Sequence, residues 1–306
     1  MRRLYRETYQ PALVITTTAS TPVGLTIDLR PYTQPVWIDW GDGVQKIVTG
    51  GLLSHTYATQ AARVLRLVPL TSRPLGDTLI VSTGSRQGGI GLPVATIPRS
   101  ITRILNLYQC SGVTGNVADL PRVTYYLGLS GVSQLTGNVA DLPRVTYILN
   151  LSGVSKLTGN VADLPRVTNT LNLSGLSQLT GNVADLPRVT YYLNLDGVSK
   201  LTGNVADLPR VTNTLNLNGC SGIGYAANYF GQYGGTYRPS TLTLSSMGWN
   251  QASVDATLAD LVAATSAAPG WTTCTLNLSG NAAPSAQGLA DRDILVSRGW
   301  TVTVAA

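Results

Sequence analysis

The side chains that most often do chemistry are scarce in this chain. Its 306 residues include one histidine, His55, three cysteines and 15 acidic residues, of which only Glu7 is a glutamate. A catalytic site needs a nucleophile with a base, a carboxylate pair or a metal site, and few of these can be built around a single imidazole. Neither of the common glycine-rich phosphate-binding motifs occurs. We therefore expect no enzyme activity, no metal site and no cofactor.

Acidic and basic side chains do recur at a fixed interval. Each copy of the motif D-L-P-R carries an aspartate followed three residues later by an arginine, and the copies start at Asp119, Asp141, Asp163, Asp185 and Asp207. Like charges stacked in columns repel, so we expect each arginine column to lie against an aspartate column. Exposed ion pairs of this kind contribute at most about 1 kcal/mol. We interpret D-L-P-R as a structural turn, not as an acid–base or metal site.

These motifs belong to a repeat with a period of 22 residues. The segment T-G-N-V-A-D-L-P-R-V-T occurs five times, starting at Thr114, Thr136, Thr158, Thr180 and Thr202. Each unit also has an L-x-L strand, such as Leu149–Leu151, whose two leucines face one side. One unit has too few apolar groups for its own core, so the units are expected to stack and share an interior. The T-G-N residues are expected to form turns, with the asparagine bonding locally.

The residues that vary between copies border the strand. They are candidates for a contact surface, at Tyr126, Ile148, Thr170, Tyr192 and Thr214, together with the strand asparagines Asn150, Asn172 and Asn194. Tyrosine with small polar neighbours suits protein or glycan contacts. Aromatic packing along a column is the structural alternative. Residues 223–237 form a Tyr/Gly-rich insertion that is a second candidate contact patch, with Tyr229, Phe230 and Tyr233.

The repeats resemble leucine-rich repeats, because L-N-L-S-G-V-S-K-L-T-G-N-V-A-D-L-P follows the pattern L-x-L-x-x-N-x-L-x-G-x-I-P, with Leu157, Gly159 and Val161 in the matching places. The asparagine that usually follows the strand is replaced by Val, Leu or Cys. Cys110 and Cys220 stand at this core position, five units apart, and Cys274 stands alone. We therefore expect three free thiols and no disulfide.

The N-terminal part reads as short strands. The residues W-G-D-G at 40–43 and H-T-Y-A at 55–58 resemble the signature of PKD-like, immunoglobulin-type sandwiches. In such domains both motifs are mostly structural, so the resemblance implies that His55 is a packing residue. The GDG turn alone is weak support for a calcium site. Residues 1–103 carry eleven basic and five acidic side chains, +6 in net charge, whereas residues 104–306 are neutral.

The C-terminal part alternates strands with helices. Strands are predicted at 241–244, 275–278 and 300–304, and helices at 253–266, with Ser253 as N-cap, and at 285–297, ended by Gly299. The chain is thus expected to be mainly β, with an immunoglobulin/PKD-like β-sandwich at 1–75, a leucine-rich-repeat-type parallel β-solenoid at 76–222, and the insertion with a β-α cap at 223–306. No apolar run is long enough for a membrane span, and the N-terminus is not a secretory signal.

The order of these parts resembles leucine-rich-repeat surface and virion proteins of bacteria and their phages, which implies adhesion or virion decoration. We expect a non-enzymatic phage virion protein, such as a capsid decoration, head fibre or tail-associated adhesin at the virion surface. Its basic N-terminal domain, including Arg2, Arg3 and Arg6, would bind virion proteins, and its repeats a host-surface glycan or protein. We also expect it to be oligomeric on the particle. A bacterial cell-surface adhesin and an interaction scaffold are the alternatives, whereas the scattered basic residues disfavour nucleic-acid binding.

Overall fold

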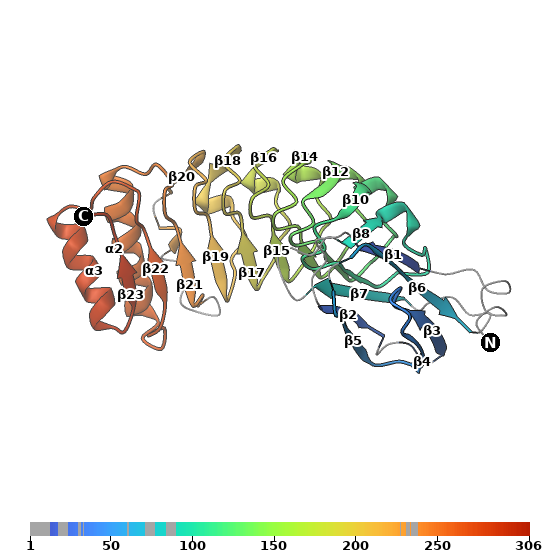
Figure 1. Ribbon diagram of the computed structural model, residues 1–306. Coiled ribbons are helices and arrows are strands. Elements are labelled where there is room, and N and C mark those ends of the chain that lie inside the picture. Colours follow the sequence, from blue (N-terminus) through green and yellow to red (C-terminus); the bar gives the residue numbers. More distant parts are fainter. Residues whose placement is uncertain are drawn as a thin grey trace. The chain divides into compact units, whose positions relative to one another are not determined.

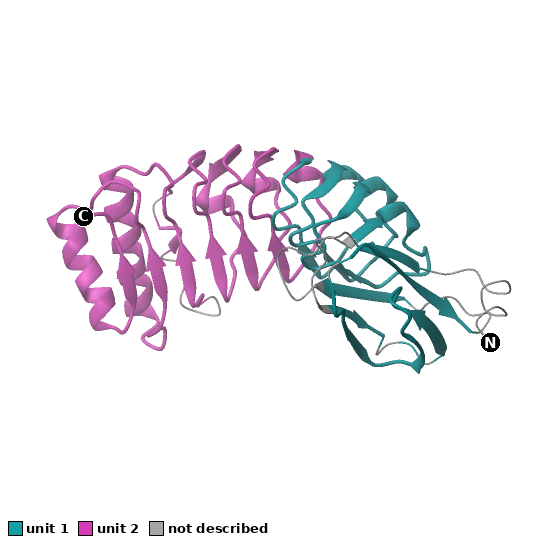
Figure 2. Cartoon of the chain, viewed as in Figure 1, with its two compact units in different colours: residues 1–157 teal, residues 158–306 magenta. Residues whose placement is uncertain are grey.

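The computed structural model (Figure 1) describes residues 13–17, 24–29, 32, 34–59, 61–70, 77–83, 90–226, 228–230, 233 and 238–306. The chain divides into two compact units, residues 1–157 and 158–306 (Figure 2). The described part is mainly β, and it carries α-helices only near its C-terminus. Its parallel strands are arranged in a way that is consistent with a solenoid.

Unit 1 begins with antiparallel strands in two sheets. The first sheet holds β1 (Leu13–Thr17), β3 (Pro35–Asp39), β4 (Gln45–Thr49), β6 (Arg63–Pro69) and β8 (Ile90–Pro93). The second holds β2 (Gly24–Asp28), β5 (Leu52–Thr56) and β7 (Thr78–Thr83). Alternate side chains form the core, because successive residues of a strand face opposite sides. Ile15 and Leu65, for example, are paired across β1 and β6 and are fully buried.

The repeats of unit 1 continue these same two sheets. Strand β7 pairs antiparallel with β2 and parallel with β9 (Ile104–Asn106). Strand β8 likewise pairs antiparallel with β1 and parallel with β10 (Val113–Asn116). Both strands lie within the segment that the sequence assigns to the solenoid. In unit 1, therefore, each sheet changes from antiparallel to parallel pairing without an interruption.

The L-x-L strands stack in parallel within each unit. In unit 1, β9 is followed by β11 (Tyr126–Gly128) and β13 (Ile148–Asn150), and in unit 2 β15 (Thr170–Asn172) is followed by β17 (Tyr192–Asn194) and β19 (Thr214–Asn216). The register advances by one 22-residue repeat, so Leu127 lies beside Leu149 and Leu193 beside Leu215. These leucines are fully buried. Stacked repeats with a common apolar interior are thus confirmed within each unit.

The T-G-N residues form a second set of parallel strands, and the expectation of turns at these positions is wrong. The strands are β10, β12 (Gln134–Asn138), β14 (Leu157–Asn160), β16 (Leu179–Asn182), β18 (Leu201–Asn204) and β20 (Ile223–Gly224). The glycine keeps an unusual backbone inside the strand, with a φ of +123° at Gly137. The asparagine does bond locally, as predicted: Oδ1 of Asn138 accepts a hydrogen bond from the backbone N–H of Ala140.

Each of these asparagines caps a single turn of 3₁₀-helix over V-A-D. The turns are η2 (Val117–Asp119), η3 (Val139–Asp141), η4 (Val161–Asp163), η5 (Val183–Asp185) and η6 (Val205–Asp207), preceded by η1 (Val94–Thr96). The predicted pairing of arginine and aspartate columns is wrong. Within each unit, no D-L-P-R arginine of the described residues forms an ion pair with an aspartate. Arg188 instead donates to the backbone carbonyl of Asp207, at 3.3 Å.

The C-terminal β-α-β-α-β cap is confirmed and extends the sheet of unit 2. Strands β21 (Thr241–Thr243), β22 (Thr275–Asn277) and β23 (Thr301–Thr303) follow β19 in parallel, separated by α2 (Gln251–Ala267) and α3 (Ala286–Ser297). The N-cap of α2 is Asn250 and not Ser253. Oδ1 of Asn250 accepts a hydrogen bond from the backbone N–H of Ser253 at 2.9 Å. Gly299, with a φ of +94°, follows α3 as predicted. None of the described helices combines the length and apolar character that crossing a membrane requires.

Candidate binding surfaces

The predicted contact residues lie on the side of the L-x-L strands that faces away from the leucines. Tyr126 and Ile148 in unit 1, and Thr170, Tyr192 and Thr214 in unit 2, are each half-buried. Because they stand at the same strand position, they form a column within each unit. The strand asparagines form the next column, and their side-chain oxygens accept the backbone N–H two residues further on, as for Asn150, Asn172 and Asn194.

Part of this column is used for packing. The ring of Tyr126 lies over Gly128, where a Cβ would come within 2.7 Å of it. Burial raises the pKa of Tyr126 above its usual range. In unit 2, Asn194 donates its side-chain amide to the hydroxyl of Tyr192 at 3.2 Å. Glycine at position 128, in place of the asparagine found in later strands, thus provides space for a tyrosine ring.

More exposed aromatic rings stand immediately before these strands. Tyr125 and Tyr147 stack face to face, with ring centroids 4.8 Å apart and an interplanar angle of 12°. The guanidinium of Arg103 lies 5.2 Å from the centroid of the Tyr125 ring, which is a cation–π geometry. Tyr125 is 37% exposed and Tyr191, at the same position in unit 2, is 46% exposed. Tyr125 and Tyr191 are therefore more exposed than Tyr126 and Tyr192, the strand residues chosen from the sequence.

Unit 1 also has a hollow of about 950 Å³, a volume within the range of small-molecule pockets. Its rim carries Arg99, Arg122 and Arg144 together with Asp141, and Leu120 and Leu142 are among its lining residues. Sequence reasoning missed these arginines as candidate ligands, because it paired them with the aspartate column. The signal that could have found them is the recurrence of D-L-P-R every 22 residues, which places successive arginines, such as Arg122 and Arg144, in neighbouring repeats.

The three aromatic side chains that were predicted to form a contact patch in the Tyr/Gly-rich insertion are buried. Tyr229, Phe230 and Tyr233 are 2%, 0% and 3% exposed, so these side chains have no surface for a partner in this structure. They pack against one another, with a hydrogen bond of 3.0 Å between the two tyrosine hydroxyls. Burial raises the pKa of Tyr229 to about 12, an effect that nearby Arg188 and Arg210 partly offset. The insertion contributes to the core because its aromatic rings gain more from packing than from hydration.

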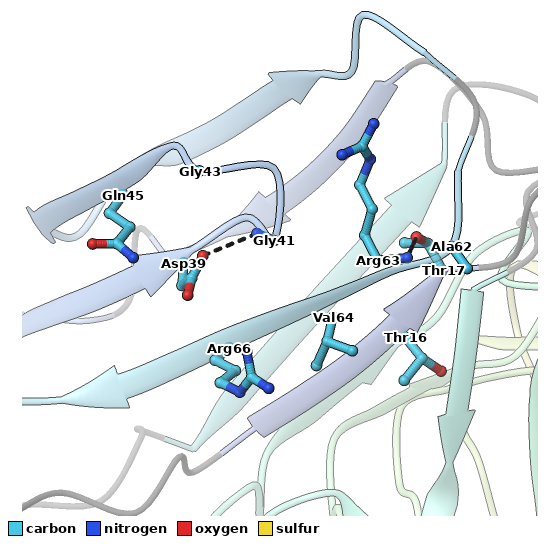
Figure 3. A pocket seen from close by; sticks show the side chains of 10 residues that line it. All are labelled: Thr16, Thr17, Asp39, Gly41, Gly43, Gln45, Ala62, Arg63, Val64 and Arg66. Atoms are coloured by element: carbon cyan, nitrogen blue, oxygen red, sulfur yellow. Dashed lines mark hydrogen bonds between the residues drawn. The ribbon is translucent and has the colours of Figure 1, made fainter. Parts of the chain in front are cut away.

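The N-terminal antiparallel part contains a second hollow, of about 800 Å³ (Figure 3). Asp39, Gln45 and Arg66 line it and share one face of the sheet, because Asp39 pairs with both of the others across β3, β4 and β6. Asp39 is 4% exposed, and its Oδ1 accepts the backbone N–H of Gly41 at 3.0 Å. A buried carboxylate that accepts a backbone hydrogen bond suits a structural role. The predicted anchoring residues Arg2, Arg3 and Arg6 lie outside the described residues.

His55 packs as the sequence predicts. Its ring stacks on Trp40 at 4.6 Å and meets the edge of Tyr57 at 4.6 Å. Its Nε2 lies 2.7 Å from Oδ2 of Asp42, the aspartate of the GDG turn. Partial burial raises the pKa of Asp42, but hydrogen bonds from His55 and from the Val44 N–H lower it. The net shift of the pKa is downward. Asp42 is thus engaged with His55, and the described residues contain no cluster of three metal-ligating side chains.

The three cysteines are buried and free, as expected. Cys110 and Cys220 donate weakly to the carbonyls of Val81 and Leu195. Burial raises the pKa of each of the three thiols to about 12. Thiols with so high a pKa are inert at neutral pH.

Comparison of the chain with protein-family models, with curated proteins and with solved structures gave no match in any of the three.

Proposed function

We propose that this chain is a non-enzymatic structural protein of a phage particle, exposed at the virion surface, which presents its repeats for binding to a protein or a glycan. The observation that carries this proposal is the column of outward-facing side chains within each unit, repeated every 22 residues above an apolar core. A surface of this kind is rigid and periodic, and it suits extended ligands. The rigidity also lowers the entropy cost of binding.

The finer fold assignment belongs to the same proposal. We assign the repeats to the leucine-rich class on the spacing of their L-x-L strands and on the buried residues that follow. We assign the N-terminal part to the PKD-like class on the W-G-D-G and H-T-Y-A residues. The packing of Trp40 on His55, and the hydrogen bond of 3.1 Å from the Tyr57 hydroxyl to the Trp40 carbonyl, support a structural role for that signature.

The basic N-terminal third is the proposed anchor. Residues 1–103 carry the whole net charge of +6, whereas the remainder is neutral. A localised basic end attracts an acidic protein surface and speeds docking at low salt. The outer side of a phage capsid or tail would provide such a surface, and the neutral repeats would then project from it. Several copies on one particle would give avidity to weak individual contacts.

The test is binding to purified particles. Particles that lack the protein are incubated with the full-length chain and sedimented, and the protein is measured in the pellet. We expect co-sedimentation at low salt and a weaker association at high salt. A triple variant with Arg2→Glu, Arg3→Glu and Arg6→Glu should remain in the supernatant, whereas the control Arg292→Glu should sediment like the wild type. Protein found by surface labelling on intact bacteria, and not on particles, would favour a cell-surface adhesin and overturn the proposal.

A further inference from the structure

We propose that the hollow beside the Tyr125–Tyr147 stack binds an acidic saccharide, with Arg122 and Arg144 holding its carboxylate or sulfate group. This inference rests on the proposed function, since it names the ligand class of the repeat surface. The site lies wholly in unit 1 and is formed by neighbouring repeats. Tyr125 follows Thr124, a lining residue of the hollow, directly in the chain, so the aromatic stack is near the hollow.

The charge of the site favours an anion. Three arginines, Arg99, Arg122 and Arg144, face one aspartate, Asp141, which leaves a local charge of +2. Arg122 and Arg144 are exposed, and neither has a hydrogen-bond or ion-pair partner among the residues that the structure describes. Arg99 is partly used, because its Nη1 donates to the carbonyl of Leu120 at 2.8 Å. Two guanidinium groups with free donors can each bind a carboxylate or sulfate in a bidentate manner.

Asp141 identifies the ligand as one that also donates hydrogen bonds. The exposed carboxylate of Asp141 lines the hollow together with the arginines and can accept hydrogen bonds from hydroxyl groups of a ligand. An acidic saccharide has both kinds of group within one sugar ring, namely an anion and several hydroxyl donors. A phosphate backbone has acceptors only, and its binding depends on neutralising many phosphates in a row. The neutral balance of residues 104–306 argues against that kind of partner.

The walls of the hollow suit the remaining surface of a sugar. Leu120, Leu142 and Pro143 line the hollow as buried residues, so part of its lining is apolar. Tyr125 does not line the hollow itself, but it follows the lining residue Thr124 and its exposed ring would give a rigid contact next to the hollow. Its stacking on Tyr147 fixes the position of the ring before the ligand arrives. Rings held in place lose little conformational freedom on binding.

The test measures binding of polygalacturonate to the full-length protein by isothermal titration calorimetry at low salt. Dextran is the neutral saccharide control, and polyglutamate and a single-stranded oligonucleotide are the other polyanions. The variant is the pair Arg122→Gln with Arg144→Gln, which changes exposed side chains and should leave the melting temperature unchanged. The matched control is Arg188→Gln in unit 2, whose guanidinium donates to Asp207 and lies near the buried Tyr229.

We expect the protein to bind polygalacturonate and not dextran. The double variant should lose affinity by about a hundredfold or more, because it removes two hydrogen-bonded charges and each contributes about tenfold or more. Arg188→Gln should keep the wild-type affinity. Absence of polygalacturonate binding, an equal loss in Arg188→Gln, or equally tight binding of polyglutamate or the oligonucleotide would each overturn the inference. The double variant should still co-sediment with particles, so failure of this inference is distinguishable from failure of the proposed anchoring function.

Discussion

Replacing Gly203 with alanine should destabilise unit 2 by about 3 kcal/mol. Gly203 has a φ of +117° within β18, where a residue with a Cβ is strained by about 1 to 3 kcal/mol. The new Cβ would lie 2.5 Å from Oδ1 of Asn182 and 2.9 Å from Cγ2 of Val183, and crowding of this kind costs about 1 to 3 kcal/mol. The loss of freedom in the unfolded chain offsets about 0.4 to 1 kcal/mol.

The clash also acts on a helix cap. Asn182 accepts the backbone N–H of Ala184 at 2.9 Å and so caps η5. If Asn182 moves to admit the methyl group, this cap is lost at a cost of about 1 kcal/mol. Either response, strain or a lost cap, lowers the free energy of unfolding. The effect is therefore expected whichever way the neighbouring repeat relaxes.

The matched control is Gly219→Ala. Gly219 also has a positive φ, +73°, but the nearest atoms to its added Cβ are those of Gly197 at 3.9 Å, which is ordinary contact. Its expected cost is about 1 to 2 kcal/mol, from the left-handed backbone alone. Urea unfolding followed by circular dichroism measures both variants, and the slope of the transition tests whether each still unfolds as the wild type does. Equal midpoints for the two variants would refute the steric argument.

Three further predictions concern the core, the thiols and the GDG turn. Leu171→Ala should cost about 3 kcal/mol in the free energy of unfolding, since the side chain is fully buried, and a loss below 1 kcal/mol in calorimetry would contradict a shared interior. Cys110 and Cys220, whose pKa values burial raises to about 12, should not react with a thiol reagent at pH 7.5 until the protein is unfolded in denaturant; rapid labelling of the native protein would count against this. The pKa of Asp42 is lowered in the folded protein, so its charged form contributes stability above the unfolded value near 3.9, and this contribution is lost as the pH falls through the folded pKa. Asp42→Asn should therefore be less stable than the wild type at pH 7 and equal to it near pH 2, and a difference that persists at pH 2 would exclude an electrostatic origin.

Strict periodicity made the solenoid-like part predictable from sequence. Leu149 and Leu151 recur at 22 residues with alternating polar neighbours, and only a strand with one buried side fits that pattern. The L-T-G-N strands escaped prediction, because glycine and asparagine together usually indicate a turn. In this protein the same pair of residues lies in a strand. Gly137 has a φ of +123°, and the asparagine after it caps a 3₁₀ turn.

Side-chain surroundings were harder to predict than strands. A Tyr/Gly-rich segment has the same composition whether its rings face solvent or pack together, and the burial of Tyr229 and Phe230 depends on contacts that no local pattern encodes. The absence of ion pairs at Arg122 and Arg144 likewise depends on the placement of long side chains, which a local sequence pattern does not specify. Strand alternation could not separate Tyr125 from Tyr126, since the first of these precedes the strand.

The most direct test of the stacked repeats is disulfide trapping in unit 2. Thr170 and Tyr192 are register partners, and neighbouring strands lie about 4.8 Å apart, which is within the span that a disulfide bridges. Thr170 and Thr214 are two repeats apart, at roughly 9.6 Å, beyond that span. The account predicts that the pair Thr170→Cys with Tyr192→Cys forms a crosslink under mild oxidation, detected by mass spectrometry, and that Thr170→Cys with Thr214→Cys does not. Crosslinking of the distant pair alone, or of neither pair, would contradict a stack of 22-residue repeats.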